Sequence, residues 1–400
     1  MIAQCDRPLA QQLVDKTVIH TSISQVDKIS WNAVIQSENI YLSIPYLASL
    51  EKALLDYSFR YFQFYSEDNK PIGIGYCQII KIGGNDINKD ALAERIGGLL
   101  PKSIMNNIDV RILICGNAFA SGENGYYFLP SIDNKLGLDL VTSAVDEVDT
   151  SAHKEGKKIA ITLIKEFWPE SFKNIAYLKE KGYCEINIDV NMVLTLDSSW
   201  TSFDHYLSDM NSKFRTKAKG IFKKSEKLTA INFDIPMIEK RLQEIDELYT
   251  IIVDKANFSF GRLNAKTLLE IKKALGHQFY FKGYYLGDKL IGFSTATSFN
   301  EVLDGNFIGL DYDNNQEYAV YQRMLYDFVQ HAIEIGAKQV KIGRTAEEIK
   351  SGVGAQPVEM KFYAKHRNKV TNALLRPFIQ KLKPNDFNLR KPFKAEYYEA

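Results

Sequence analysis

The chain has 400 residues, of which 45% are hydrophobic and 25% charged, and its formal net charge is +1 at pH 7. This length predicts two or three domains. The near-neutral charge excludes a general attraction to nucleic acid or anionic lipid, so any electrostatic recognition must be local. No stretch approaches the roughly 20 apolar residues that cross a bilayer, and the first residues lack an apolar leader, so a cytoplasmic location is expected.

The four cysteines and six histidines are scattered along the chain. None has the spacing of a zinc site or a dithiol redox site, so we expect buried free thiols, no metal and no tightly bound cofactor. The Gly-x-Ser-x-Gly elbow and the phosphate-binding loop of nucleotide hydrolases are also missing, which argues against serine-hydrolase and nucleotide-hydrolase chemistry.

In the first half of the chain, hydrophobic periodicity predicts alternating strands and helices. They are, in chain order, a helix at 42–56, a hairpin of strands at 61–65 and 72–80, a helical stretch around 92–99, a strand at 110–115, a glycine-rich loop at 116–125, a helix at 138–153, a buried strand at 159–164, a helix at 172–181 and a strand at 186–196.

The second half repeats this order. Its predicted elements are strands at 279–286, 290–297 and 302–310, a long helix at 317–335, a strand at 339–342, a short helix capped by Thr345 with Glu348 completing a capping box and Gly352 and Gly354 ending it, and a strand at 358–363. Two amphipathic helices at 203–222 and 238–252 lie between the halves. We therefore predict an α/β protein with mixed sheets. Its domains would be 1–198 and 199–400, the second opening with a basic helical connector at 199–276.

The repeated order of hairpin, third strand, helix, strand and helix resembles the core of the GNAT acyltransferases. Two such cores in tandem resemble the Fem-type peptidoglycan aminoacyltransferases, Fem-like proteins and cellulose-associated acetyltransferase-like proteins. The strongest local matches are residues 318–322, 342–344 and 348–354, together with the basic helix at 213–217.

The resemblance implies an N-acyltransferase that moves an acyl group from acyl-CoA or an acyl carrier protein to a small amine. A Fem-type enzyme that uses aminoacyl-tRNA on a cell-wall precursor is the alternative, and a non-catalytic ligand- or partner-binding protein is another. One departure bears on the donor. Residues 314–319 lack the glycines that hold the pyrophosphate of coenzyme A at a helix start, whereas a carrier protein or tRNA would not need that loop.

Candidate site residues gather in the second half. The candidates for catalysis are Lys350, Asp304, Tyr285 and Tyr318, and those for substrate binding are Arg344, Asn306, Tyr312, Glu348 and Tyr321. A lysine can hold developing negative charge, a carboxylate can anchor an amine, and a phenol can return a proton to the leaving group. The alternatives are a solvated lysine, an aspartate on an uncovered sheet face and tyrosines that only pack.

Residues 213–227 carry seven positive charges against the single carboxylate of Glu226. This stretch predicts a surface for an anionic partner: a carrier protein, a nucleotide diphosphate, tRNA or a peripheral membrane contact. With a net charge of only +1, a carrier protein or a phosphate ranks above tRNA, and a merely solvated face is the alternative. The residues expected to bind the carrier or phosphate are Arg215, Lys217, Lys219 and Lys223.

Overall fold

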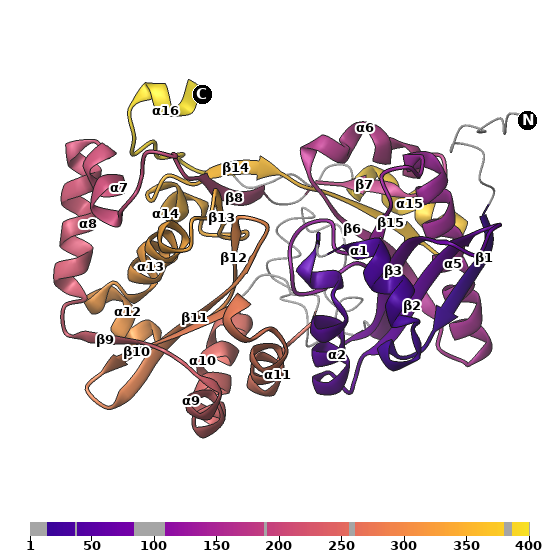
Figure 1. Ribbon diagram of the computed structural model, residues 1–400, viewed down its shortest axis with the longest axis horizontal. Coiled ribbons are helices and arrows are strands. Elements are labelled where there is room, and N and C mark those ends of the chain that lie inside the picture. Colours follow the sequence, from indigo (N-terminus) through magenta and orange to yellow (C-terminus); the bar gives the residue numbers. More distant parts are fainter. Residues whose placement is uncertain are drawn as a thin grey trace, which may run out of the picture. The chain divides into compact units, whose positions relative to one another are not determined.

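The computed structural model describes residues 14–36, 38–83, 109–187, 190–255, 261–379 and 386–399. The chain divides into two compact units. The first unit comprises Met1–Asn187 and Met360–Leu382, and the second comprises Ile188–Glu359 and Lys383–Ala400 (Figure 1). The predicted helical stretch around 92–99 lies outside the described residues.

The first unit is built on a mixed sheet. Its strand order is β1 (Val14–His20), β2 (Ser58–Ser66), β3 (Pro71–Gly83), β4 (Asp109–Cys115), β6 (Ile159–Phe167), β15 (Lys361–His366) and β7 (Cys184–Ile186), with β5 (Tyr126–Phe128) pairing β3. Only β4 and β6 pair in parallel among these strands. The other elements are α1 (Lys28–Ile35), α2 (Ile44–Ala53), α5 (Asn134–Lys154), α6 (Phe172–Ile175) and α15 (Lys369–Ile379).

The second unit repeats this plan. Its strand order is β14 (Gln356–Glu359), β8 (Val190–Thr195), β13 (Gln339–Lys341), β12 (Val302–Leu310), β11 (Lys289–Phe299), β10 (Phe279–Leu286) and β9 (Leu228–Asn232). Its helices are α7 (Phe203–Asp209), α8 (Ser212–Lys224), α9 (Ile235–Lys240), α10 (Leu242–Lys255), α11 (Ala265–Leu275), α12 (Tyr312–Tyr318), α13 (Val320–Glu334), α14 (Glu347–Ser351) and α16 (Ala395–Glu399). The predicted α/β class with two repeated halves is confirmed.

The two sheets exchange strands. The chain leaves the first sheet after β7 and supplies β8 to the second sheet, where it lies between β13 and β14. It later returns from β14 as β15, which lies between β6 and β7 of the first sheet. The predicted strands at 186–196 and 358–363 are therefore each two strands in different sheets. The units differ from the predicted ranges in the same places, since 188–198 belong to the second unit and 360–382 to the first.

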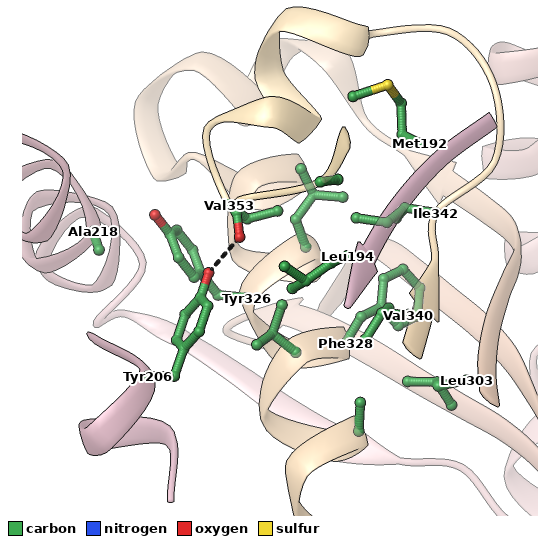
Figure 2. Packing of buried hydrophobic residues seen from close by; sticks show 14 of the residues in the cluster. Met192, Leu194, Tyr206, Ala218, Leu303, Tyr326, Phe328, Val340, Ile342 and Val353 are labelled. Atoms are coloured by element: carbon green, nitrogen blue, oxygen red, sulfur yellow. Dashed lines mark hydrogen bonds between the residues drawn. The ribbon is translucent and has the colours of Figure 1, made fainter. Parts of the chain in front are cut away.

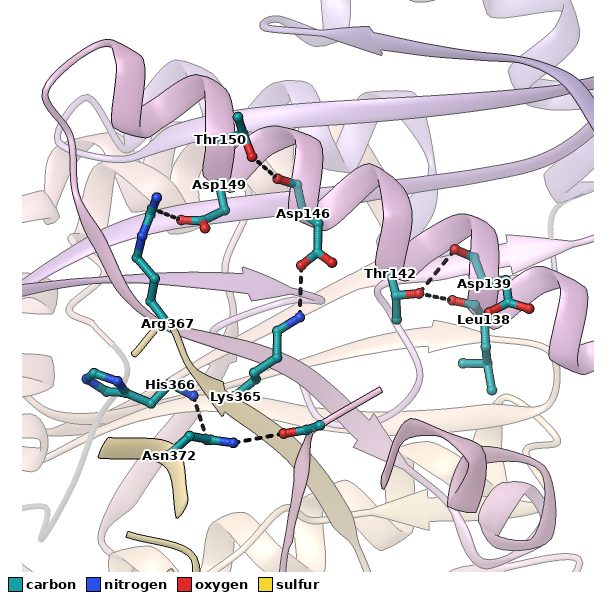
Figure 3. Close-up of polar contacts among 11 residues, drawn as sticks. Leu138, Asp139, Thr142, Asp146, Asp149, Thr150, Lys365, His366, Arg367 and Asn372 are labelled. Atoms are coloured by element: carbon teal, nitrogen blue, oxygen red, sulfur yellow. Dashed lines mark hydrogen bonds and ion pairs between the residues drawn. The ribbon is translucent and has the colours of Figure 1, made fainter. Parts of the chain in front are cut away.

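Ionic contacts fasten the returning strand to α5 (Figure 3). The Lys365 Nζ lies 2.9 Å from Asp146 Oδ1, and the Arg367 Nη1 lies 2.8 Å from Asp149 Oδ1. The backbone amide of His366 donates to Asn372 Oδ1, whose side chain in turn donates to the carbonyl of Gly182. Residues more than 200 positions apart in the sequence thus hold β15 against α5.

The hydrophobic core of the second unit includes the exchanged strand β8 (Figure 2). Met192 and Leu194 from β8 are fully buried with Val340 and with Phe328 of α13. The hydroxyl of Tyr206 donates to the carbonyl of Val353 at 2.8 Å, joining α7 to the turn after α14. This packing fixes β8, β13 and α14 relative to one another.

Several predicted boundaries differ from the structure. The long helix at 317–335 is α12 and α13, divided at Ala319, which adopts φ 51°. The helix at 203–222 is likewise divided into α7 and α8, and that at 172–181 into short turns around α6. The capping box at Thr345 is wrong, because Thr345 and Ala346 are both left-handed and α14 starts at Glu347 with no side-chain cap. The strands at 279–286 and 302–310 are confirmed.

A buried carboxylate connects α13 to the sheet. Asp327, 1% exposed, accepts hydrogen bonds from Tyr284 Oη and Arg323 Nε, both at 2.9 Å, and lies 3.5 Å from Lys282 Nζ. We expect Asp327→Ala to lower the free energy of unfolding by about 3 kcal/mol, because it removes a buried acceptor from Tyr284 and leaves the partly exposed Lys282 and Arg323 without their carboxylate. Scanning calorimetry would measure this, with the exposed Asp313→Ala as control. Equal melting temperatures for the two variants would contradict the expectation.

Candidate active site

The parallel strands β12 and β13 separate in the middle of the second sheet. Only Val302, Leu303 and Asp304 of β12 pair with β13, and β12 continues to Leu310 without it. The residues just after β13 are hydrogen-bonded to β8 and not to β12. The amide of Ile342 donates to Met192 O, and the amide of Met192 donates to Gly343 O. A gap therefore opens between the carboxyl ends of two central strands, where ligands collect in open α/β sheets.

A β-bulge faces this gap. The register between β11 and β12 shifts so that two residues, Asn306 and Phe307, oppose Thr295. The Thr295 hydroxyl holds the backbone N–H and C=O of Phe307 at 2.9 and 3.0 Å, and the Thr297 hydroxyl donates to Asn306 Oδ1 at 2.6 Å. Bulges re-aim side chains beside functional sites, and two threonines fix this one.

Polar residues share one face of the sheet at the point of separation. Leu303 and Val340 point into the core under α13, so their neighbours Asp304 and Lys341 point to the opposite face. Asp304 and Lys341 are Cα partners, and Asp304 is also the partner of Thr297 on β11. Asp304 is only 4% exposed. A buried carboxylate is retained at such a position only with compensating polar contacts, which makes this face a candidate for binding an amine.

The loop after β13 is conformationally strained. Gly343, Thr345 and Ala346 have φ angles of 72°, 64° and 52°. For the β-branched Thr345 and for Ala346 this left-handed conformation costs on the order of 1–3 kcal/mol each, and such costs concentrate at functional sites. The loop carries Arg344 past the end of β13.

Lys350 closes this loop from α14. Its Nζ donates to the carbonyl oxygen of Arg344 at 2.6 Å, and the residue is 4% exposed. Burial lowers the pKa of Lys350 to about 7, with Arg344 lowering it further and Glu347 opposing the change. At neutral pH the amino group therefore exists in both protonation states, which is the property that proton exchange requires.

The corresponding place in the first unit is filled by the chain itself. There β4 and β6 pair as far as Cys115 and Ile164, and the loop at 116–125 then folds against the end of β6. The Gly122 amide donates to Glu166 Oε2 at 3.1 Å, and the Glu166 amide donates to Gly122 O at 3.3 Å. A Cβ on Gly116 would lie 2.7 Å from the Lys165 carbonyl oxygen. Because the loop fills this place in the first unit, we assign the candidate site to the gap between β12 and β13 of the second unit.

Three of the tyrosines proposed as site residues lie close together in the sequence but have different surroundings. Tyr321, in the first turn of α13, is largely buried, and burial raises its pKa. Tyr312 lies under Lys255, whose Nζ is 3.5 Å from the ring centroid. A hydrogen bond to Glu317 raises the pKa of Tyr318. The three lie near the start of α13, at the carboxyl end of β12.

Tyr285 does not join the other candidates. It lies on β10, two strands from β12, and about six residues further along the strands than Asp304, which corresponds to about 20 Å. Arg241 stacks on its ring, at 4.9 Å from the centroid. Glu348, also a candidate, points from α14 to Arg390, whose Nη2 lies 2.5 Å from Glu348 Oε1. The candidates Tyr285 and Glu348 therefore contact Arg241 and Arg390, and neither contact brings them to Asp304.

Helix α8 presents a basic outer face. Its inner face, with Ala218 and Ile221, packs in the core of the second unit, and its remaining surface carries Lys213, Arg215, Lys217, Lys219, Lys223 and Lys224. Within the described parts of the chain none of these six forms an ion pair. Partial burial, with Arg390 and Lys213 nearby, lowers the pKa of Lys217. The side chain of Lys217 also borders a narrow crevice shared with Ile349 and Gly352 of the α14 region.

The start of α13 is partly occupied by the protein's own groups. The amide of Tyr321 donates to Asn315 Oδ1 at 2.9 Å, and α12 with the left-handed Ala319 takes the place of a glycine-rich loop. One of the N–H groups that a bound pyrophosphate would need is thus already used.

Comparison with solved structures shows that the chain has a tandem GNAT-like fold, similar to that of FemX. The similar structures include FemX (TM-score 0.54, 12% identity, 90% of this chain and 100% of FemX) and a tandem GNAT protein from the clavulanic acid biosynthesis pathway (TM-score 0.52, 9% identity, 88% and 99%). The C-terminal domain of a putative lysylphosphatidylglycerol synthetase from Agrobacterium fabrum also matches (TM-score 0.48, 11% identity, 90% and 97%). No protein-family model and no curated protein matches the sequence. At these identities the likeness defines the fold alone.

Among the described residues, no helix is long and apolar enough to cross a membrane, and no cluster of three or more His, Cys, Asp or Glu side chains has the arrangement of a metal site. Sequence reasoning missed Lys341 and Thr297 beside Asp304. The alternation of apolar and polar residues could have indicated both, because Lys341 follows the core residue Val340 and Thr297 follows the core residue Ala296.

Proposed function

We propose that the chain is an N-acyltransferase whose second unit transfers an acyl group from an activated carrier to an amine. The observation that carries the proposal is the gap between β12 and β13, which is flanked by Asp304 and the Arg344 loop, while the first unit fills its own equivalent. The GNAT-like fold of both units agrees with this chemistry.

The reaction needs an amine nucleophile, a polarised carbonyl and a proton path. In the proposal Asp304 holds the acceptor amine at the bulge, with Asn306 beside it. The amine nitrogen attacks the acyl carbonyl carbon, and Arg344 faces the negative charge that develops on the carbonyl oxygen. Lys350, whose pKa burial lowers to about 7, takes the proton that the amine loses. The bond between the acyl carbon and the carrier breaks, and the protonated Lys350 passes this proton to the departing sulfur or oxygen, which leaves as a thiol or hydroxyl.

An acyl carrier protein or another anionic carrier fits this chain better than free acyl-CoA. The basic face of α8 offers six cations that form no ion pair with any residue the structure describes, and Lys217 borders a crevice shared with α14. The start of α13, by contrast, lacks glycine and has its Tyr321 amide already bonded. The acidic recognition surface of a carrier would bind α8 and direct the acyl group toward the gap.

The test offers acyl-CoA, acyl carrier protein and aminoacyl-tRNA donors with pooled amines and identifies products by mass spectrometry. We expect product with a carrier-bound donor. Because Asp304 holds the acceptor amine, Asp304→Asn should lower kcat/KM for the amine by about 10²-fold, with Lys266→Met on the exposed face of α11 as the control. Replacing Lys217, Lys219 and Lys223 by Glu should raise the KM for the donor without changing kcat. If the folded protein gives no product with any donor, the proposal is contradicted and a non-catalytic binding protein is favoured.

A Fem-type transfer from aminoacyl-tRNA is the second candidate. The width of the basic face favours it, since cations spread over the whole solvent side of α8 suit an extended phosphate backbone. In the same assay this candidate predicts product only with aminoacyl-tRNA. Binding of tRNA would then weaken steeply with salt, and the triple glutamate variant would show a smaller salt slope than the wild type.

A further inference from the structure

A separate cavity lies at the outer edge of the second sheet. Its volume is about 360 Å³, within the usual range for small-ligand sites. The floor comes from β9 and β10: Thr229 and Ile231 are Cα partners of Tyr285 and Gly283 and share their face of the sheet. The ring of Phe233 lies across Gly283, where a Cβ would be 2.2 Å from it. Glycine at this position therefore lets an aromatic ring form part of the floor.

One wall of the cavity is cationic. Met237, Lys240 and Arg241, in and just after α9, line it. Arg241 stacks on the Tyr285 ring, and its Nη1 is 2.8 Å from Glu244 Oε1, so its position is fixed. Within the described part of the chain Lys240 has no ion-pair partner. Among the described residues, this wall therefore offers Lys240 without an ion-pair partner and the guanidinium of Arg241, which Glu244 holds in place.

The remainder of the lining is apolar and open to solvent. Ile231 is 37% exposed and Met237 is 41% exposed, so both present apolar surface to solvent at the cavity. Asp288, in the turn between β10 and β11, is the single carboxylate of the lining. A neutral apolar ligand would leave Lys240 without a partner, and a small inorganic anion would leave Ile231 and Met237 exposed. A ligand with both an anionic group and a flat apolar body satisfies both.

We propose that this cavity is a binding site for an amphipathic anion, in which a carboxylate, phosphate or sulfonate contacts Lys240 and Arg241 and an apolar ring or short chain covers Ile231 and Phe233. The site stands apart from the gap at Asp304, because β9 lies three strand spacings, or about 14 Å, from β12. It gives Tyr285 a role in ligand binding rather than in acyl transfer. The inference does not depend on the proposed reaction.

The test is isothermal titration of the intact protein with naphthalene-1-sulfonate, with neutral naphthalene-1-sulfonamide as the matched probe. We expect the sulfonate to bind more tightly than the sulfonamide. Lys240→Ala and Arg241→Ala should each weaken sulfonate binding about tenfold, as is typical of a lost charge-assisted hydrogen bond. Lys266→Ala, an exposed lysine of the same unit outside the cavity, should bind as the wild type does.

A second variant tests the floor independently of the cations. Ile231→Glu changes a partly exposed side chain and should keep the fold, which circular dichroism would verify. The new carboxylate lies beside the anionic group of the ligand, so its repulsion should abolish binding. Three results would overturn the proposal: no heat with the sulfonate at millimolar concentration, equal affinity for both probes, or wild-type affinity in the double variant Lys240→Ala/Arg241→Ala.

Discussion

Residues 1–198 expressed alone are expected not to fold. In the intact chain β15 lies between β6 and β7 and contributes the fully buried Tyr363, whose hydroxyl donates to Glu185 at 2.9 Å. Without β15, both neighbours lose their shared partner and the core of the first unit loses a large aromatic side chain, a loss worth about 3–5 kcal/mol for that residue alone. Circular dichroism on heating should show no cooperative transition.

Reassembly provides the control. Residues 1–187 mixed with a peptide of residues 360–379 should recover a cooperative transition, because the peptide carries β15 and the Lys365 and Arg367 contacts to α5. The same peptide with Tyr363→Ala should bind far more weakly. A cooperative melt of residues 1–198 without any peptide would contradict the expectation and would mean that the exchanged strand is dispensable.

The second large effect is expected from Lys350→Met. The folded pKa of Lys350 is about 7, against an ordinary value of 10.5. Between these values the unfolded chain binds the proton more readily than the folded one, so the stability of the wild type rises as the pH increases from 7 to 10.5. At or below pH 7 the full cost of the buried charge, on the order of 5 kcal/mol, applies.

Methionine fills a similar volume without charge, so the variant should be more stable than the wild type at pH 6 by about 3 kcal/mol, once the lost hydrogen bond to Arg344 is subtracted. The advantage should vanish near pH 9, where the remaining cost of the buried charge equals the lost hydrogen bond of about 2 kcal/mol, while transferase activity falls at every pH. Urea unfolding across the pH range measures this, and Lys266→Met should show no such trend. A variant that is less stable than the wild type at pH 6 would contradict the assigned burial and pKa of Lys350.

Regular strands with clear turns could be predicted from the sequence. The strands at 279–286 and 302–310 match exactly, because alternating apolar residues and the Gly287-Asp288 turn are local signals. The exchange of β8 and β15 could not be predicted, since residues 186–196 and 358–363 read as continuous strands and their pairing is decided by distant parts of the chain. The break at Ala319 was not predicted either, because alanine favours helix and nothing in the local sequence indicates its left-handed conformation.

The candidate site was predictable in part. Lys350 and Arg344 were proposed together, and the Lys350 Nζ donates to the carbonyl of Arg344. The left-handed turn at Thr345 and Ala346 that allows this contact was not predicted. The grouping of Asp304 with Tyr285 required knowledge of strand order and register, which the sequence pattern does not contain. The roles of all these residues remain predictions for the variants described above.

The strand exchange also bears on how the protein is made. During translation the chain up to Asn187 emerges with β6 and β7 in place but without the strand that belongs between them. The ribosome must add residues 188–360 before β15 follows, which at ordinary elongation rates takes on the order of ten to thirty seconds. For that interval the nascent first sheet carries an unfilled seam with unpaired backbone groups, which is a ready template for wrong pairing. Synthesis of this protein should therefore depend on chaperones that cover such edges.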